Sequence, residues 1–267
     1  MPTSAPIHYD PAAALAAGLA AIALLAWAFW PAKGLWAWWR RLRRAGARVE
    51  AEDALKHICL AELEGHEATP QSVAGALQIS LGRALEAVER LERSGLVRTD
   101  RGRLRLTDPG RRYALQIIRA HRLWESQLAE RTGLPEHEWH AQAEAAEHRL
   151  SPEDLDRLAA QLGHPTHDPH GDPIPTSDGR LRPPPGKPLT AFEPGGAVRV
   201  VHIEDEPEST YAQLVKLGLY PGQSLRIIGK NEREITVRDG RREIRIPRLA
   251  AANLTAEAVP CGAVLVS

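Results

Sequence analysis

The chain has 267 residues, and its 34 Lys and Arg balance its 34 Asp and Glu, so its formal net charge is zero at pH 7. This length allows one large or two small domains with proper hydrophobic cores, which excludes a scaffold that needs disulfides to fold. The balanced total indicates no partner, so only local clusters of charge are informative. Two distant cysteines, Cys59 and Cys261, lack CxxC spacing, which favours buried thiols in a reducing compartment.

An uncharged stretch near the amino terminus, residues 12–30 (AAALAAGLAAIALLAWAFW), resembles a membrane span. About 19 residues at ~1.5 Å rise approach the thickness of a hydrocarbon core. Indoles and cations of the kind found at membrane interfaces lie at the end of this stretch and directly after it: Trp27, Trp30, Lys33, Trp36, Trp38, Trp39, Arg40, Arg41, Arg43 and Arg44. We predict a single-pass anchor over 1–47 in the cell membrane, with the soluble domains in the cytoplasm. A cleaved signal peptide is the alternative, but no basic residue precedes the apolar run.

The soluble part is predicted to begin near Val49 with an amphipathic helix that Gly65 ends. Thr69 and Pro70 have the types of an N-cap and a first-turn proline, so a short helix starts there. A turn at 78–80 leads to a longer helix, LGRALEAVERLERSG. Two helices joined by such a turn form a helix-turn-helix.

The next segment, LVRTDRGRLRLTDPGRR, alternates around an Asp-Arg-Gly turn and predicts a two-stranded wing. Its arginines are candidates for phosphate contacts: Arg98, Arg101, Arg103, Arg105, Arg111 and Arg112. The helical pattern alone also occurs in ordinary bundles. With the basic wing beside it, we interpret 48–113 as a winged helix-turn-helix DNA-binding domain.

A later stretch, HAQAEAAEH, places two imidazoles and two carboxylates on one stripe of a helix. His140, Glu144, Glu147 and His148 are its polar members, at offsets of zero, four, seven and eight. His121 and Glu125, one turn apart in HRLWE, supply a second row. Nitrogen and oxygen donors of this kind suit a first-row divalent metal. The alternative is a solvated polar face.

A proline-rich loop, GHPTHDPHGDPIP, follows a helix that Ser151 and Pro152 are expected to start. A metal-binding loop with His164, His167 and His170 is one interpretation of it. Ordered surface turns are the interpretation that we favour. We therefore assign 114–175 to a helical metal-binding and dimerisation domain.

The carboxyl-terminal part follows a proline- and glycine-rich linker at 176–193. Residues 194–267 alternate in short apolar runs around one helical patch, YAQLVKLGL. This pattern predicts a small SH3-like β-barrel. The expected fold class is therefore mainly α with a small β-barrel and an N-terminal transmembrane helix.

In this order, EDALKHI, the winged helix-turn-helix, HRLWE, HAQAEAAEHRLS and GHPTHDPHGDPIP resemble the metal-dependent transcriptional repressors typified by the diphtheria toxin repressor and the manganese transport regulator. The resemblance covers 49–175. Residues 194–267 resemble the SH3-like domain of the iron-type repressors and the FeoA-type proteins, closest at LGLYPGQSLRIIG. In that family a metal ties the first helix to the dimerisation helices and sets the spacing of two DNA-reading heads.

The resemblance implies a set of metal ligands and a set of DNA contacts. The ligands are Asp53, His121, Glu125, His140, Glu144, Glu147 and His148, for Mn2+ or Fe2+. The DNA contacts are Ser80, Gly82 and Arg83, with Arg98, Arg101 and Arg103 from the wing. The partners it implies are double-stranded DNA and a second copy of the chain. Leu85 and Glu86, which also fall at contact positions, are unfavourable choices for binding DNA.

Other departures from the family concern the metal. Asp53 and Glu144 resemble the manganese-type site, whereas Lys56 stands where that subgroup has a glutamate ligand. An ammonium cannot bind metal and would repel a second ion. An acidic run (Glu204, Asp205, Glu206, Glu208) lies near the loop from which the family's SH3-like domain supplies a ligand. Because Pro207 disrupts the match, we favour solvated loop residues there.

These features predict a membrane-tethered, metal-dependent regulator, a repressor of metal-uptake genes. The alternative is a metal-sensing module that acts on a membrane metal transporter without binding DNA. An enzyme is not expected, because HExxH is absent, EAAEH lacks the first histidine of an inverted zincin motif, and there is no Gly-rich phosphate loop.

Overall fold

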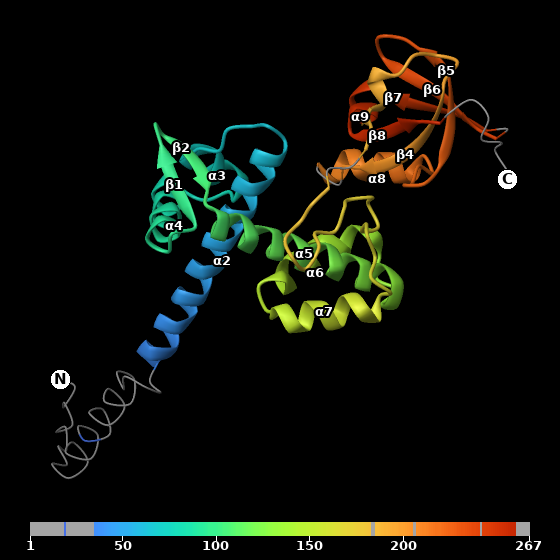
Figure 1. The fold of residues 1–267 in the computed structure, drawn as a ribbon. Coiled ribbons are helices and arrows are strands. Elements are labelled where there is room, and N and C mark those ends of the chain that lie inside the picture. Colours follow the sequence, from blue (N-terminus) through green and yellow to red (C-terminus); the bar gives the residue numbers. More distant parts are fainter. Residues whose placement is uncertain (1–18, 20–34, 183–184, 205–206, 241, 260–267) are drawn as a thin grey trace, which may run out of the picture. The chain divides into compact units, whose positions relative to one another are not determined.

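The computed structural model describes residue 19 and residues 35–182, 185–204, 207–240 and 242–259 (Figure 1). The chain divides into two compact units, Met1–Asp53 and Ala54–Ser267. Helices account for most of the second unit up to the end of α7 (Pro152–Gln161), and strands dominate after it. The predicted order of helical and β segments is therefore present.

Helix α2 (Leu35–Leu63) is continuous, so the predicted juxtamembrane segment and first soluble helix are one element (Figure 1). It buries Leu55, Ile58 and Cys59 completely. Burial raises the pKa of the Cys59 thiol to about 11, so this free cysteine is an unreactive core residue. Cys261 lies outside the described residues.

Among the described residues, no helix combines the length and apolarity that crossing a bilayer requires. The longest helix, α2, carries charges through much of its length, from Arg40 and Arg41 to Glu62. This finding corrects the predicted transmembrane fold and cell-membrane location. The predicted span at 12–30 lies, apart from Leu19, outside the described residues.

The helix-turn-helix consists of α3 (Pro70–Ala76) and α4 (Leu81–Arg93). Thr69 caps α3 in a capping box with Ser72, and Ser80 caps α4, as their residue types predict. Helix α4 turns Ala84, Ala87, Val88 and Leu91 inward. Its apolar stripe therefore fixes which face stays exposed.

The wing is an antiparallel hairpin of β1 (Val97–Asp100) and β2 (Arg103–Leu106). Its two-residue turn, Arg101 and Gly102, has positive φ at both positions, 51° and 80°, which matches the right-handed twist of a tight hairpin. Glu62 on α2 accepts a hydrogen bond from the Leu106 amide at 3.0 Å, so the wing is held to the first helix.

The helical domain is built from α5 (Asp108–Arg131), the 3-10 turn η1 (Glu136–Glu138), α6 (Trp139–Glu147) and α7 (Pro152–Gln161). Leu123 of α5 packs with Leu155 and Ala159 of α7 and with Ile174 of the proline-rich loop. This core holds the loop against α5.

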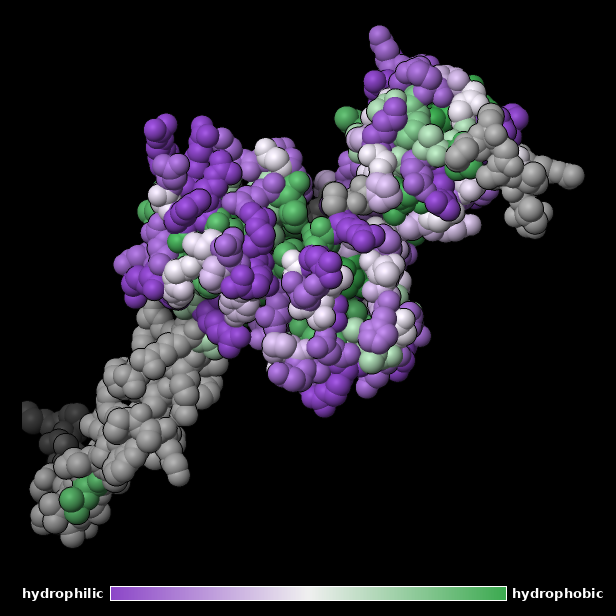
Figure 2. All heavy atoms as spheres, in the orientation of Figure 1, coloured by the Kyte–Doolittle hydropathy of each residue, from purple (hydrophilic) through white to green (hydrophobic). Residues whose placement is uncertain are grey.

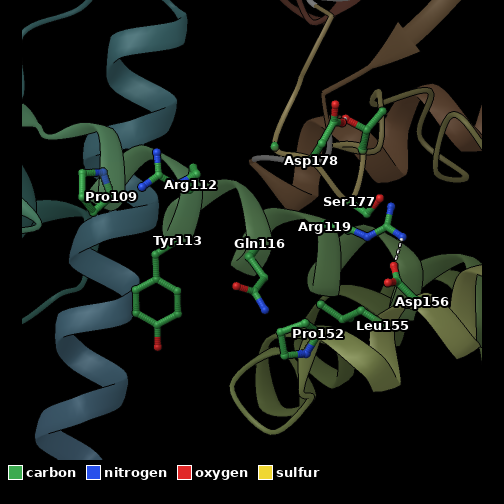
Figure 3. Close-up of a pocket in the computed structure, with 12 residues that line it drawn as sticks. Pro109, Arg112, Tyr113, Gln116, Arg119, Pro152, Leu155, Asp156, Ser177 and Asp178 are labelled. Atoms are coloured by element: carbon green, nitrogen blue, oxygen red, sulfur yellow. Dashed lines mark hydrogen bonds and ion pairs between the residues drawn. The ribbon is translucent and has the colours of Figure 1, made fainter.

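A cavity of about 460 Å³ is lined by residues of α5, of α7 and of the segment 176–179 (Figure 3). Arg119 reaches from α5 to Asp156 of α7, at 3.1 Å, and also donates to the carbonyl of Pro175. Among the residues that the structure describes, no imidazole lines this cavity, and the predicted ligands lie elsewhere.

The carboxyl-terminal sheet has the strand order β3-β8-β4-β5-β6-β7. Its elements are β3 (Lys187–Pro188), η2 (Leu189–Ala191), β4 (Ala197–Ile203), α8 (Glu208–Lys216), β5 (Ser224–Lys230), β6 (Glu234–Asp239), β7 (Arg242–Pro247), α9 (Arg248–Ala252) and β8 (Leu254–Ala258). Alternate residues such as Val198, Ile227 and Ile246 enter one core.

This sheet is open, which corrects the predicted β-barrel. Among the described strands, β3 and β7 are edges that do not pair with each other. Edge strand β3 has only two residues, and Pro188 lacks the amide hydrogen that a further ladder needs. At the other edge, Arg242, Glu243 and Arg245 of β7 are exposed and charged, which discourages further pairing.

Candidate metal centre and nucleic-acid interface

The candidate metal centre is organised around Glu125, a carboxylate on α5 that is only 1% exposed. Its Oε1 lies 3.1 Å from Nε2 of His121, one turn earlier on α5, and 3.4 Å from Nδ1 of His140 on α6. One ligand atom from each of these three residues lies within 4.8 Å of the others. The structure therefore brings together three of the predicted ligands from two helices.

Charge keeps Glu125 ionised in this buried position. Burial acts to raise its pKa, but hydrogen bonds with His121 and His140 outweigh that effect and hold the pKa well below its usual range. Burial likewise acts to lower the pKa of His121, but Glu125 and Glu147 raise it overall. The cluster therefore retains a carboxylate that can bind a cation.

Glu147 of α6 joins the cluster through His121, whose Nδ1 lies 2.5 Å from Glu147 Oε2. Lys56 of α2 also contacts this carboxylate, with Nζ at 2.9 Å from Oε2 and 3.2 Å from Oε1. Burial acts to raise the pKa of Glu147, and the partners His121 and Lys56 lower it overall. Glu147 is therefore an ionised carboxylate that already has a cation beside it.

The remaining predicted ligands lie at the margin of the cluster around Glu125 or outside that cluster. Glu144 is 3.5 Å from Nε2 of His140 but has a mostly exposed side chain, and His148 Nε2 is 3.6 Å from Glu147 Oε1. Asp53 is half-buried on α2 and is the last residue of the first unit. Its part in the site stays a prediction.

A second ligand group shares Glu125 with the first. Of its other members, His170 was named only in the metal-loop interpretation that we did not favour, and Asp168 was not predicted. Glu125, Asp168 and His170 are all buried and offer ligand atoms within 4.8 Å of one another. The surface turn that we favoured for the proline-rich loop is wrong for His170, which is 3% exposed, but it holds for His164 and His167, which are exposed. The signal that could have found this group is Asp-Pro-His-Gly ahead of the buried Ile174.

Asp168 provides a test of whether this group fits a cation. Its Oδ1 accepts hydrogen bonds from the amides of His170 and Asp172, both at 2.9 Å, whereas its buried Oδ2 accepts none. Burial and the neighbouring carboxylates of Asp172 and Glu125 raise the pKa of Asp168. A carboxyl group held in this way suits a positive ion, which would displace its proton.

The carboxyl-terminal domain contacts the same loop. The amide of Ile203 on β4 donates to the carbonyl of His170 at 3.0 Å, and the rings of His170 and Tyr211 meet edge to face at 5.0 Å. Tyr211 also donates a hydrogen bond to Glu136. His202 Nδ1 lies 3.7 Å from Asp172. The second ligand group is thus covered by the sheet domain.

A cavity of about 490 Å³ opens onto these groups. Its lining includes Lys56, His121, Glu125, His140, Glu144, Asp168, Asp172 and Glu204. Glu204 is exposed, and Asp205 and Glu206 lie outside the described residues. Imidazole and carboxylate donors therefore face one hollow that water and ions can reach.

The residues predicted to contact DNA are Ser80, Gly82, Arg83, Arg98, Arg101 and Arg103, and all of them are exposed. Figure 2 shows mainly hydrophilic side chains over the winged helix-turn-helix. Leu85 and Glu86, the two residues that are unfavourable at contact positions, are also exposed on α4. Arg103 is also paired with Glu67. Contact with DNA stays a prediction.

Two protein families match separate parts of the chain. Residues 107–176 match the family described as iron dependent repressor, metal binding and dimerisation domain. Residues 187–258 match the FeoA domain family. These matches cover the helices with the ligand groups and the open sheet, respectively.

Individual relatives agree with these families. The chain is 40% identical over 117 residues to the iron-dependent repressor IdeR of Mycobacterium tuberculosis, covering 43% of this chain and 51% of that protein. A solved manganese-dependent transcriptional repressor in complex with manganese is 32% identical, with a TM-score of 0.72, and the match covers 78% of this chain and 100% of that one.

A relative of another kind is a probable metal transport system membrane protein of Chlamydia trachomatis. It is 40% identical over 83 residues, which are 31% of this chain and 18% of that protein. The chain spans about half the length of the curated repressors that it matches.

Proposed function

Because this chain belongs to the family of metal-dependent transcriptional repressors with a FeoA domain, we propose that it represses transcription in response to Mn2+ or Fe2+. The observation that carries the proposal is the buried carboxylate of Glu125, which gathers imidazoles from α5, α6 and the proline-rich loop. The winged helix-turn-helix in the same chain supplies the means to read DNA. No catalytic role is proposed, in keeping with relatives that are repressors rather than enzymes.

The proposed metal ligands are Glu125 with His121 and His140, joined by Asp168 and His170. When bound, a divalent ion supplies positive charge that holds donors from separate segments together. Glu125 orients His121 and His140 by accepting from both rings. We further propose that Asp53 extends the site from α2, as its match to the family implies.

The donor types favour manganese or ferrous iron. Carboxylate oxygens outnumber thiolates here, because Cys59 is in the core and no other described residue offers sulfur to the site. Oxygen-rich sites suit these ions, although zinc binds mixed nitrogen and oxygen donors more tightly where it is available. The known dependence of the relatives on iron and on manganese supports this choice.

We propose that two copies of the chain bind double-stranded DNA as a homodimer near metal-uptake genes. Ser80, Gly82 and Arg83 would enter the groove at the start of α4, while wing arginines contact phosphates. Two copies related by symmetry present two such heads, whose separation the ligands on α5 and α6 would set.

An electrophoretic retardation experiment tests this function. The full chain, freed of metal with EDTA, is mixed with DNA from its own upstream region at several Mn2+ and Fe2+ concentrations. We expect retardation only with metal, and much weaker retardation for Glu125→Gln. The proposal is contradicted if retardation is the same with and without metal and the same in Glu125→Gln as in the parent. It is also contradicted if no retardation occurs at saturating metal.

A second candidate function is control of a metal transport system without DNA binding. It is the alternative that the sequence left open, and its one point of contact with the comparisons is the 40% identity over 83 aligned residues with the probable metal transport system membrane protein of Chlamydia trachomatis. Leu85 and Glu86 on the exposed face of α4 agree with weakened DNA contact. Metal binding without DNA retardation, together with copurification of a transport protein, would support this candidate over the first.

A further inference from the structure

Lys56 places an ammonium group among the candidate ligands. Its Nζ lies 2.9 Å and 3.2 Å from the two oxygens of Glu147 and 3.2 Å from Nδ1 of His121. An ammonium has three protons and no lone pair. It can donate to both oxygens of Glu147 and lies against Nδ1 of His121, so it occupies the place of a metal ion bound by these two residues, and it cannot itself act as a ligand.

Burial makes this contact more than a surface ion pair. The side chain of Glu147 is 1% exposed and that of Lys56 is 17% exposed. A buried carboxylate without a cation is strongly unfavourable, so some positive group has to accompany Glu147. In this chain Lys56 provides it from α2, while His121 approaches from α5.

A divalent ion bound by Glu147 and His121 would have to displace the ammonium or tolerate its repulsion. Lys56 and His121 line the same cavity as Glu125 and His140. The carboxylate of Glu125 contacts the imidazoles of His121, His140 and His170. The two buried carboxylates therefore differ in their partners, because Glu147 contacts an ammonium as well as an imidazole, whereas Glu125 contacts imidazoles.

We propose that Lys56 is an internal cation that competes with metal for Glu147 and for Nδ1 of His121, so that metal binds first at Glu125 and Nε2 of His121. This inference rests on the proposed metal-dependent function and specifies how its site is regulated. Lys56 acts as a positioning residue that limits how many ions bind and how tightly. Removal of its charge opens the Glu147 half of the cluster to metal.

Mn2+ titration of the full chain, after EDTA treatment, tests this inference by calorimetry and by the electron paramagnetic resonance of free Mn2+. Lys56→Met keeps the length of the side chain and removes its charge. We expect it to bind one further equivalent, or to bind Mn2+ roughly ten-fold more tightly than the parent. Lys56→Arg should retain the parent's stoichiometry, and the exposed Lys216→Met is the matched control.

Thermal unfolding provides a second measurement. Without metal, Lys56→Met should melt below the parent because Glu147 loses its partner, and Mn2+ should raise its midpoint more than the parent's. Lys56→Gln serves as a second variant that keeps a hydrogen-bond donor. If both uncharged variants stay unfolded in saturating Mn2+, metal cannot replace the ammonium and the inference is overturned.

The outcomes separate this inference from the proposed function. Equal stoichiometry and affinity in the parent, Lys56→Met and Lys56→Gln overturn the inference while metal binding by the parent upholds the function. Metal binding by the uncharged variants but not by the parent overturns the inference that metal binds first around Glu125, and it contradicts a metal-dependent function of the natural chain. Absence of binding in every variant contradicts both.

Discussion

Glu125 and His170 lie 3.8 Å apart, measured from the carboxylate Oε2 to the imidazole Nδ1. Glu125 lies on α5, whereas His170 lies in the proline-rich loop that follows α7, so the contact joins two separate segments. Glu125 uses its other oxygen for His121 and His140. One carboxylate therefore links two groups of candidate ligands, and its loss should affect both.

Replacement of Glu125 by Gln should weaken Mn2+ binding by about 100-fold or more, because an amide removes a negative charge shared by both groups. Glu144→Gln, which changes a mostly exposed carboxylate 3.5 Å from His140, should cost less than about ten-fold. Calorimetric titration of the full chain measures both. A larger loss for Glu144→Gln would show that Glu125 is not the central ligand.

Asp168→Asn should separate metal binding from folding. The Asn carbonyl can still accept from the amides of His170 and Asp172, and the raised pKa of Asp168 already favours an uncharged group there. We expect little change in the thermal midpoint without metal but about ten-fold weaker Mn2+ binding. Exposed Asp178→Asn is the control. Unchanged affinity in Asp168→Asn would remove this residue from the ligand set.

Acid should destabilise the metal-free protein in a way that depends on Glu147. Its pKa is below the usual 4.5 in the folded chain, although burial opposes this, because His121 and Lys56 favour the ionised form. Its stabilising contribution is therefore fully present above pH 4.5 and is lost as pH falls through the lowered folded value.

Denaturant unfolding in EDTA at several pH values below about 5 measures this loss. Glu147→Gln should be less stable at pH 7 and should show a shallower decline on acidification. Glu125, whose pKa is also lowered, should add to the decline that remains. Parallel curves for the parent and Glu147→Gln would contradict the expected role of this carboxylate.

Gly171→Ala should loosen the contact between the proline-rich loop and the sheet domain. Gly171 has φ of 90°, and an added Cβ would meet the carbonyl oxygen of Val201 at 2.1 Å. Backbone atoms cannot rotate away, so we expect a loss of about 2 kcal/mol or more in the free energy of unfolding. Gly65→Ala, also at positive φ but with open space, is the control for backbone strain alone.

Arg98→Ala and Arg101→Ala should weaken DNA binding without changing sequence preference, because both exposed wing arginines are proposed phosphate contacts. Each should reduce the slope of log affinity against log salt by about one. Filter binding at several salt concentrations measures this slope with Mn2+ present. Arg226→Ala, exposed on the carboxyl-terminal sheet, should leave it unchanged.

Local sequence signals predicted the DNA-reading elements well. Thr69 caps its helix through the amide of Ser72, three positions later, and Arg101 with Gly102 forms the tight turn of the wing. Such signals depend only on neighbours in the chain, so a sequence contains them completely. The pairing of His121 with Glu125, one helical turn apart, belongs to the same class.

Other expectations failed because they depended on distant partners. The barrel was expected from strand alternation, but closure requires the first and last strands to pair, and the short β3 and charged β7 do not. The membrane prediction rested on the hydropathy of 12–30. Among the described residues, no helix is long and apolar enough to cross a bilayer. Alternation and hydropathy describe a segment, whereas closure and insertion depend on its surroundings.

By itself, then, the sequence determined the helix-turn-helix, the wing and a row of metal-type donors on α5 and α6. Only the tertiary structure decided that His170 and Asp168 are buried beside Glu125, and that the Lys56 ammonium lies against Glu147. The physical reason is range: caps, turns and helical stripes are fixed by nearby residues, whereas burial and the meeting of charges from separate elements arise only when the chain packs.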